Sequence, residues 1–407
     1  MMRALFTISL LELFIGGGGR LTAVGPVSLR MLLFSACLAA TLVAILFPRR
    51  RTDGVLLAML LVLIYLLVHV FGLLIGAIEG ADASQMLTEF QQSLYWLAAP
   101  FFALMVQSEE DARRYASLVQ VAGIGLACGY LVILVSLVSG VIPVSLVRTV
   151  LARGHEISFR SSEFFIYKGF LYLGIAIIFI VASRGKFWAL LATLVALAMA
   201  LTFTRGFIIS TSAGVLIMLC VQRRWRVAAP AILLVAAATF VVWIYLPSLD
   251  STVLANRDLS TNQRVEDMTY MFYHARAKTF LVGEGYGSLI NNRSNIENTF
   301  LWALWKLGTV GLIFWTIPLS LCVYYYTKIS NARSNPLANA YFFGTVAVYV
   351  QTATNPLLNN PIGLSFVMLS IFSLRILSRG EQNPAVSGRT TADIRQSIKD
   401  NNSSQRS

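Results

Sequence analysis

Long apolar runs alternate with short polar segments along most of the chain. A membrane-spanning helix needs about 20 predominantly apolar residues, with a range of roughly 17 to 25. By this criterion the pattern predicts about twelve spans and therefore an all-α, polytopic membrane protein. The predicted spans cover approximately residues 3–17, 27–47, 54–76, 91–107, 115–140, 166–183, 187–204, 206–222, 227–246, 304–326, 337–354 and 361–378.

Composition supports the membrane class. Hydrophobic residues make up 57% of the 407 residues and charged residues only 13%. Soluble globular domains have roughly a quarter charged residues, so the composition excludes that class. The first apolar run ends in Gly16 to Gly19 and Arg20 without a small-residue cleavage site, so we interpret it as a span rather than a cleaved signal peptide.

Basic residues follow every even-numbered predicted span. Cytoplasmic loops of membrane proteins carry an excess of lysine and arginine, so these ends and both termini are predicted to be cytoplasmic. The same rule accounts for much of the net charge of +13 without nucleic-acid binding. The basic clusters are Arg49 to Arg51, Arg113 with Arg114, Arg184 with Lys186, Arg223 with Arg224 and Arg226, Lys328 with Arg333, and Arg375 with Arg379.

The predicted spans divide the chain into four parts. Residues 1–246 contain spans one to nine, and residues 247–303 form a large periplasmic loop. Residues 304–379 contain the last three spans. Residues 380–407 are rich in Ser, Asn, Gln and Arg and are predicted to be a disordered cytoplasmic tail.

The large loop is predicted to contain helices. Ser260 and Gln263 have capping-box spacing, and apolar residues follow with helical periodicity at Val265, Met268, Met271 and Phe272. We predict an amphipathic helix at the membrane surface that ends at Gly283. A second helix over residues 296–307 is predicted to lead into span ten.

Arg205 is the first candidate for chemistry. Residues 188–221 are almost continuously apolar and would be about 51 Å long as one helix, too long for a bilayer of roughly 30 Å. Two short spans are therefore predicted, with Arg205 and Gly206 at the outer turn between them. An arginine near the membrane interior is a functional-site candidate. The alternative is that its side chain extends to lipid headgroups.

Arginines in the large loop suggest a bound anion, because the positive-inside rule disfavours them there. They include Arg264, Arg276 and Arg293. The alternative is that long loops cross the membrane regardless of charge. For Arg264, a local i,i+3 ion pair with Asp267 is a further alternative.

The stretch GEGYG, residues 283–287, and the pair Glu297–Asn298 complete the candidate features. The glycines lack dinucleotide-fingerprint spacing and instead permit a tight turn that approaches a ligand closely. Glu297 and Asn298 open a tryptophan-rich helix, where a carboxylate is favoured by the helix dipole and an amide can cap. The functional alternative is that Glu297, buried near the membrane, is a general base for a hydroxyl group.

Together these stretches resemble the O-antigen ligase and polymerase superfamily of bacterial inner membranes. TRG at 204–206 is similar to the arginine segment between two short spans, and NQRVEDMTYMF at 262–272 to the helix that begins with a second arginine. GEGYG is similar to a GxGxG turn, and ENTFLWALWKLGTVG, with Gly308 and Gly311, to the segment after it. The family's ligases typically have histidine where this chain has Glu297, which favours a polymerase.

The resemblance implies a GT-C-like glycosyltransferase that acts with inversion and without a metal or cofactor. Its donor would be a polyprenyl (undecaprenyl) diphosphate-linked oligosaccharide and its acceptor a saccharide, at a site facing the periplasm. Arg205 and Arg264 would hold the diphosphate, Glu297 would deprotonate the acceptor, and Asn298 would help to position it. Further substrate-binding residues are predicted at Arg276, Arg293, Gly285 and Tyr286. Membrane lipid and a chain-length regulator protein are the other expected partners.

Two alternatives remain. One is a ligase that transfers polysaccharide to a lipid A-core acceptor, because no motif identifies the acceptor. The other is a transporter or flippase, which usually has charges near the bilayer midplane and inverted repeats. No internal repeat is found, and His69 and Glu79 are isolated in the sequence. We interpret His69 as a buried, hydrogen-bonded residue.

Overall fold

The computed structural model describes residues 1–17, 23–24, 27–47, 53–151, 157–159, 165–202, 204–224, 251–294 and 296–380. Most of this part is helical, as predicted; the exceptions are loops and two short two-stranded antiparallel sheets. The sheets pair β1 (Ala23–Val24) with β2 (Val27–Ser28) and β3 (Ile157–Phe159) with β4 (Phe165–Tyr167). The helices are α1 (Met2–Ile15), α2 (Leu29–Leu46), α3 (Asp53–Ile78), α4 (Ala83–Ser93), η1 (Leu94–Ala98), α5 (Ala99–Met105), α6 (Glu109–Val138), α7 (Val144–Leu151), η3 (Lys168–Phe170), α8 (Leu171–Ser183), α9 (Trp188–Leu201), α10 (Arg205–Val221), α12 (Ser251–His274), α13 (Ala277–Val282), α14 (Thr299–Lys328), α15 (Pro336–Thr352) and α16 (Pro361–Gly380).

Within the described part, 5 helices are long and apolar enough to cross a membrane: α2, α3, α6, α14 and α16. Helices α8, α9 and α10 are apolar but shorter. The protein is thus a polytopic, helical membrane protein. The span predicted at 91–107 is not one continuous helix, because the 3₁₀ helix η1 precedes the short helix α5. The ninth predicted span, 227–246, lies outside the described residues, as do 381–407 of the predicted tail, so the count of twelve and the GT-C-like fold stay predictions.

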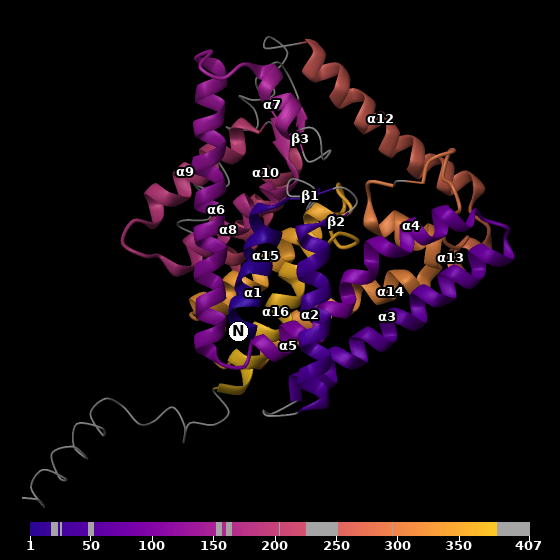
Figure 1. The fold of residues 1–407 in the computed structure, drawn as a ribbon, viewed down its shortest axis with the longest axis horizontal. Helices are drawn as coiled ribbons and strands as arrows, with labels where there is room; N and C mark the ends of the chain where they lie inside the picture. The colour runs from indigo at the N-terminus through magenta and orange to yellow at the C-terminus, as the bar shows by residue number, and fades with distance from the viewer. Residues whose placement is uncertain are drawn as a thin grey trace, which may run out of the picture.

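Helix ends that were predicted to be cytoplasmic lie together. Arg3 Nη2 of α1 is 3.0 Å from Asp111 Oδ1 at the start of α6. Gln120 Nε2 of α6 donates to Ser183 Oγ at the end of α8, at 3.3 Å. The chain begins at the same end of the molecule at which α16 finishes (Figure 1). These four helix ends therefore lie at one end of the bundle, as the prediction requires, and the assignment of this end to the cytoplasm stays a prediction.

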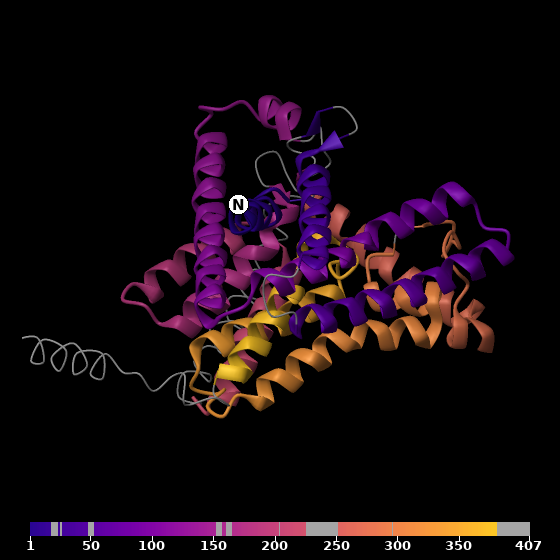
Figure 2. The same cartoon turned by 60° about the horizontal axis from the view of Figure 1, so that its bottom comes forward.

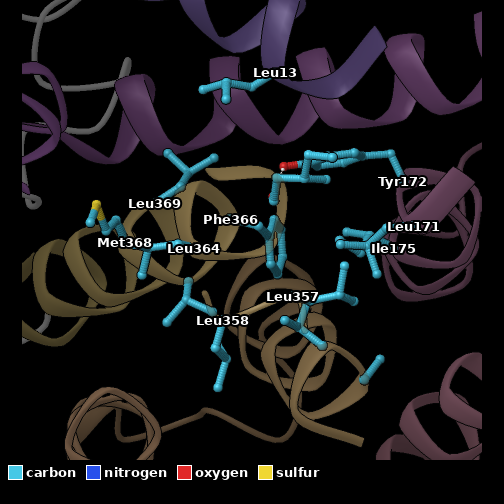
Figure 3. Close-up of a cluster of buried hydrophobic side chains, with 14 of the residues drawn as sticks. Leu13, Leu171, Tyr172, Ile175, Leu357, Leu358, Leu364, Phe366, Met368 and Leu369 are labelled. Atoms are coloured by element: carbon cyan, nitrogen blue, oxygen red, sulfur yellow. Dashed lines mark hydrogen bonds between the residues drawn. The ribbon is translucent and has the colours of Figure 1, made fainter. Parts of the chain in front are cut away.

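A buried apolar core joins α1, α8, α15 and α16. Figure 3 shows Leu13, Tyr172 and Phe366 within this cluster. The Tyr172 hydroxyl donates to the Ile362 carbonyl at 2.7 Å and lies 3.1 Å from Ser365 Oγ. These bonds hold α8 to the first turn of α16.

Helices α3, α4, α13 and α14 form a second group at one side of the molecule, away from α6, α8 and α9 (Figures 1 and 2). Helices α3 and α14 run side by side, and α13 packs on α14. Helix α12 runs towards this group and ends beside it (Figure 1). The later part of the large loop, from α13 to the start of α14, lies in this second group.

The prediction for the loop helix is partly wrong. Helix α12 begins at Ser251 rather than near Ser260, so Ser260 lies inside the helix and does not cap it. The helix is interrupted after His274, and α13 then ends at Gly283, as predicted, with φ 82°. Helix α14 begins at Thr299 and bends at Gly308, so its first segment corresponds to the second predicted loop helix.

We expect Tyr172→Phe to lower the thermal stability of the purified protein in detergent. The variant loses the hydroxyl that bonds to Ile362 and Ser365 in the core, which corresponds to about 1 kcal/mol of unfolding free energy. The matched control is Tyr324→Phe, because Tyr324 is exposed. Equal melting temperatures for the two variants would contradict this account of the core.

Candidate functional site

Arg205 lies at a helix start, as predicted. Helix α9 ends at Leu201 and α10 begins at Arg205, so the long apolar stretch is divided in two. The Arg205 side chain is exposed and forms no ion pair within the described residues. Gly206 packs closely on the end of α15: a Cβ at this position would lie 2.7 Å from Gln351 Nε2.

Arg264 of α12 pairs with Glu297 just before α14. Its Nε donates to Glu297 Oε2 at 2.6 Å, and the two side chains are 36% and 41% exposed. The local pair of Arg264 with Asp267 that was considered from the sequence does not form. Glu297 is also more exposed than predicted. A charge-assisted bond thus joins two motifs 33 residues apart in sequence.

Arg293 takes the partner that Arg264 does not use. Its Nη2 bonds to Asp267 and donates to the Gln263 carbonyl at 3.1 Å. Asp267 is buried, and burial raises the pKa of its carboxyl group while the Arg293 guanidinium opposes that shift. Two ion pairs therefore fasten α12 to the segment that leads into α14. Arg276, exposed at the start of α13, takes part in neither pair.

Asn298 caps α14. Its Oδ1 accepts from Phe300 N at 2.9 Å and from Leu301 N at 3.2 Å. The capping alternative is confirmed, and a contact of Asn298 with substrate stays a prediction.

The GEGYG turn is held by hydrogen bonds to the backbone of α3 and α14. Its backbone N–H groups donate to Trp305 O (2.7 Å, from Glu284), Lys306 O (3.0 Å, from Gly285) and Gly72 O (3.0 Å, from Tyr286). The Trp305 and Lys306 carbonyls lie in α14 just before its bend at Gly308, a residue with φ 63°. The glycines thus permit a close approach to α3 and α14, and an approach to a ligand stays a prediction.

Tyr286 is fully buried in this turn. Its hydroxyl forms a hydrogen bond with His69 Nδ1 of α3, which confirms that His69 is buried and hydrogen-bonded. A Cβ on Gly285 would lie 2.1 Å from Gly76 N, so that position admits only glycine without a shift of α3. The structure gives Gly285 and Tyr286 packing roles, and their contact with substrate stays a prediction.

A buried ion pair lies behind the turn. Lys306 of α14 is 0% exposed, and its Nζ is 2.8 Å from Glu89 Oε1 of α4. The same Nζ donates to the Ser288 carbonyl, and Glu89 Oε2 accepts from Gly287 N at 3.1 Å. The charges thus bind the turn to both helices.

A series of contacts connects Arg205 with the Arg264–Glu297 pair. Gly206 lies on Gln351, two residues after Tyr349 in α15. The Tyr349 ring lies 6.4 Å, centroid to centroid, from the Phe300 ring, at the start of α14. The starts of α10 and α14 therefore lie at the same end of the bundle, next to the end of α15.

Comparison with known proteins shows a similarity over most of the chain. The chain is 25% identical over 380 residues to a protein named O-antigen polymerase from Shigella flexneri. The aligned region covers 90% of this chain and 94% of that protein. No family model matches the chain. The predicted resemblance to the O-antigen ligase and polymerase superfamily is confirmed.

Two residues that shape this candidate site, Lys306 and Glu89, were not predicted from the sequence. Lys306 was detectable, because it is a charged residue within the apolar run of predicted span ten, and such residues are functional candidates by default. Glu89 gave no such signal, because it lies in a polar segment. Glu79, isolated in the sequence, pairs with Lys278 of α13.

We expect Lys306→Met to destabilise the protein strongly. The variant leaves Glu89 buried without its partner, which costs about 3–5 kcal/mol when one member of a buried pair is removed. The double variant Lys306→Met with Glu89→Gln removes both charges and is expected to recover most of that loss. Thermal unfolding in detergent, followed by size-exclusion chromatography, measures the difference.

The matched control is Lys278→Met. Lys278 and Glu79 form a half-exposed pair, and exposed pairs contribute about 1 kcal/mol or less. If Lys306→Met were as stable as Lys278→Met, the buried pair would not hold this part of the structure.

Proposed function

We propose that the protein polymerises lipid-linked oligosaccharide repeat units, such as those of O-antigen, at the bacterial inner membrane. The name of the Shigella flexneri relative supports this activity. The observation that carries the chemical part is the Arg264–Glu297 ion pair at the start of α14, at the same end of the bundle as Arg205. It combines a base with cationic groups, as glycosyl transfer from a diphosphate donor requires.

Glu297 is the proposed general base. The acceptor hydroxyl oxygen attacks the anomeric carbon of the donor sugar, and its proton passes to the Glu297 carboxylate. The bond between the anomeric carbon and the diphosphate oxygen breaks, and its electron pair leaves with the polyprenyl diphosphate. Attack opposite the leaving group inverts the configuration of the anomeric carbon.

Arg264 has two proposed tasks. Its Nε holds Glu297, and a guanidinium has five N–H donors, so donors remain for a phosphate. A diphosphate that binds Arg264 competes with Glu297 for the positive charge and thereby frees the carboxylate for proton transfer. Donor binding would thus activate the base.

Arg205 supplies the second positive charge. Arginine stays charged and binds phosphate through its planar fork, so two arginines stabilise the leaving group without a metal ion. The donor's lipid tail would lie against exposed apolar side chains of the large loop, such as Val265, Met268 and Phe272. The site would face the periplasm, with both termini in the cytoplasm.

We expect Glu297→Gln to abolish the product ladder that purified wild-type protein forms from a polyprenyl diphosphate-linked repeat unit. Loss of a positioned base lowers the rate by about 10²- to 10⁴-fold. The assay contains EDTA, because no metal is required by the proposal. Glu109→Gln is the matched control: Glu109 also pairs with an arginine, Arg113, but at the opposite end of the bundle.

A full ladder with Glu297→Gln would refute the general-base role. No ladder with the wild type would refute the polymerase, and transfer to an added lipid A-core acceptor would then favour the ligase.

A further inference from the structure

Gln351 has no partner for its polar atoms. It lies near the end of α15 with 1% exposure, and neither its Nε2 nor its Oε1 has a hydrogen-bond partner in the described structure. A carboxamide offers two N–H donors and an acceptor, and buried polar groups of this kind are nearly always paired. Such a group therefore points to a ligand that supplies the partner.

The carboxamide lies against the first turn of α10. A Cβ on Gly206 would lie 2.7 Å from Gln351 Nε2 and 3.2 Å from its Oε1. Because glycine has no Cβ, the carboxamide can lie directly against the α10 backbone at this position. Arg205 precedes this contact by one residue.

The first turn of α10 also lacks a side-chain cap. Its N-cap residue, Thr204, accepts no capping bond, and its hydroxyl donates instead to the Thr202 carbonyl at 3.2 Å. By contrast, Asn298 caps α14 and Asn335 caps α15. The N–H groups of the first turn of this 17-residue helix thus remain available to an anion, together with the positive end of the helix dipole.

We propose that the first turn of α10 and the Gln351 carboxamide form a binding site for a phosphate group of the lipid-linked donor, beside Arg205. The identity of the ligand rests on the proposed function. Backbone N–H groups at a helix start bind phosphate oxygens, Gly206 lets the carboxamide lie beside these groups, and Gln351 Nε2 adds a directed donor. Because the carboxamide is shielded from water, its bond to a charged oxygen is stronger than at the surface.

Gln351→Leu tests the site by binding alone. The probe is farnesyl diphosphate, which has no sugar, and its affinity for the purified, detergent-solubilised protein is measured by calorimetry. We expect the variant to bind it about tenfold more weakly than the wild type, since a hydrogen bond to a charged group is lost. Binding of farnesol, which lacks phosphate, is expected to be unchanged.

Gln120→Leu is the matched control. It is the same substitution at the opposite end of the bundle, where Gln120 bonds to Phe179 O and Ser183 Oγ. Gly206→Ala is a second, independent variant, because the added methyl group displaces the carboxamide. It decides the question if Gln351→Leu fails to fold.

Unchanged affinity of Gly206→Ala and Gln351→Leu for farnesyl diphosphate would overturn the proposal. So would wild-type protein that binds farnesyl diphosphate no more tightly than farnesol. The proposed function fails separately: wild-type protein that binds farnesyl diphosphate but forms no ladder is not a polymerase, and the phosphate site stands.

Discussion

Lys306 and Glu89 are two opposite charges that are buried between α14 and α4. Neither charge is stable there alone, so α14 and α4 must meet, and their meeting point fixes the GEGYG turn through Gly287 and Ser288. The GEGYG turn then donates hydrogen bonds to the α14 carbonyls near the Gly308 bend and packs closely against α3. These contacts hold the first segment of α14, which begins just after Glu297 and is capped by Asn298.

Interrupted helices supply the candidate site. Helix α10 starts in the middle of an apolar stretch, and α14 starts beside the folded loop, so both present their N-terminal ends at one end of the bundle. Positive helix ends and arginines at the same place favour an anionic ligand. The ion pairs from Arg264 and Arg293 then hold α12 next to this end. A rigid helical frame thus positions side chains that belong to distant parts of the sequence.

Local features of the sequence were predictive, and long-range pairings were not. Apolar runs located the helices, the excess length of 188–221 located the break before Arg205, and Gly283 marked a helix end because these signals act within a few residues. The sequence favoured the neighbour Asp267 as a partner of Arg264, but the folded loop offers Glu297, 33 residues away. Lys306 and Glu89 are 217 residues apart, and their pairing depends on how whole helices pack. The start of α12 was misplaced because Ser260 has the spacing of a cap without being at a helix end.

We propose above that Arg205, Arg264 and Glu297 act on one donor molecule. The most direct measurement is a cryo-electron microscopy structure of the protein in lipid nanodiscs with a bound polyprenyl diphosphate-linked repeat unit. We expect diphosphate density between Arg205 and Arg264, with a sugar next to Glu297. Diphosphate density at the other end of the bundle, or in contact with neither arginine, would contradict it.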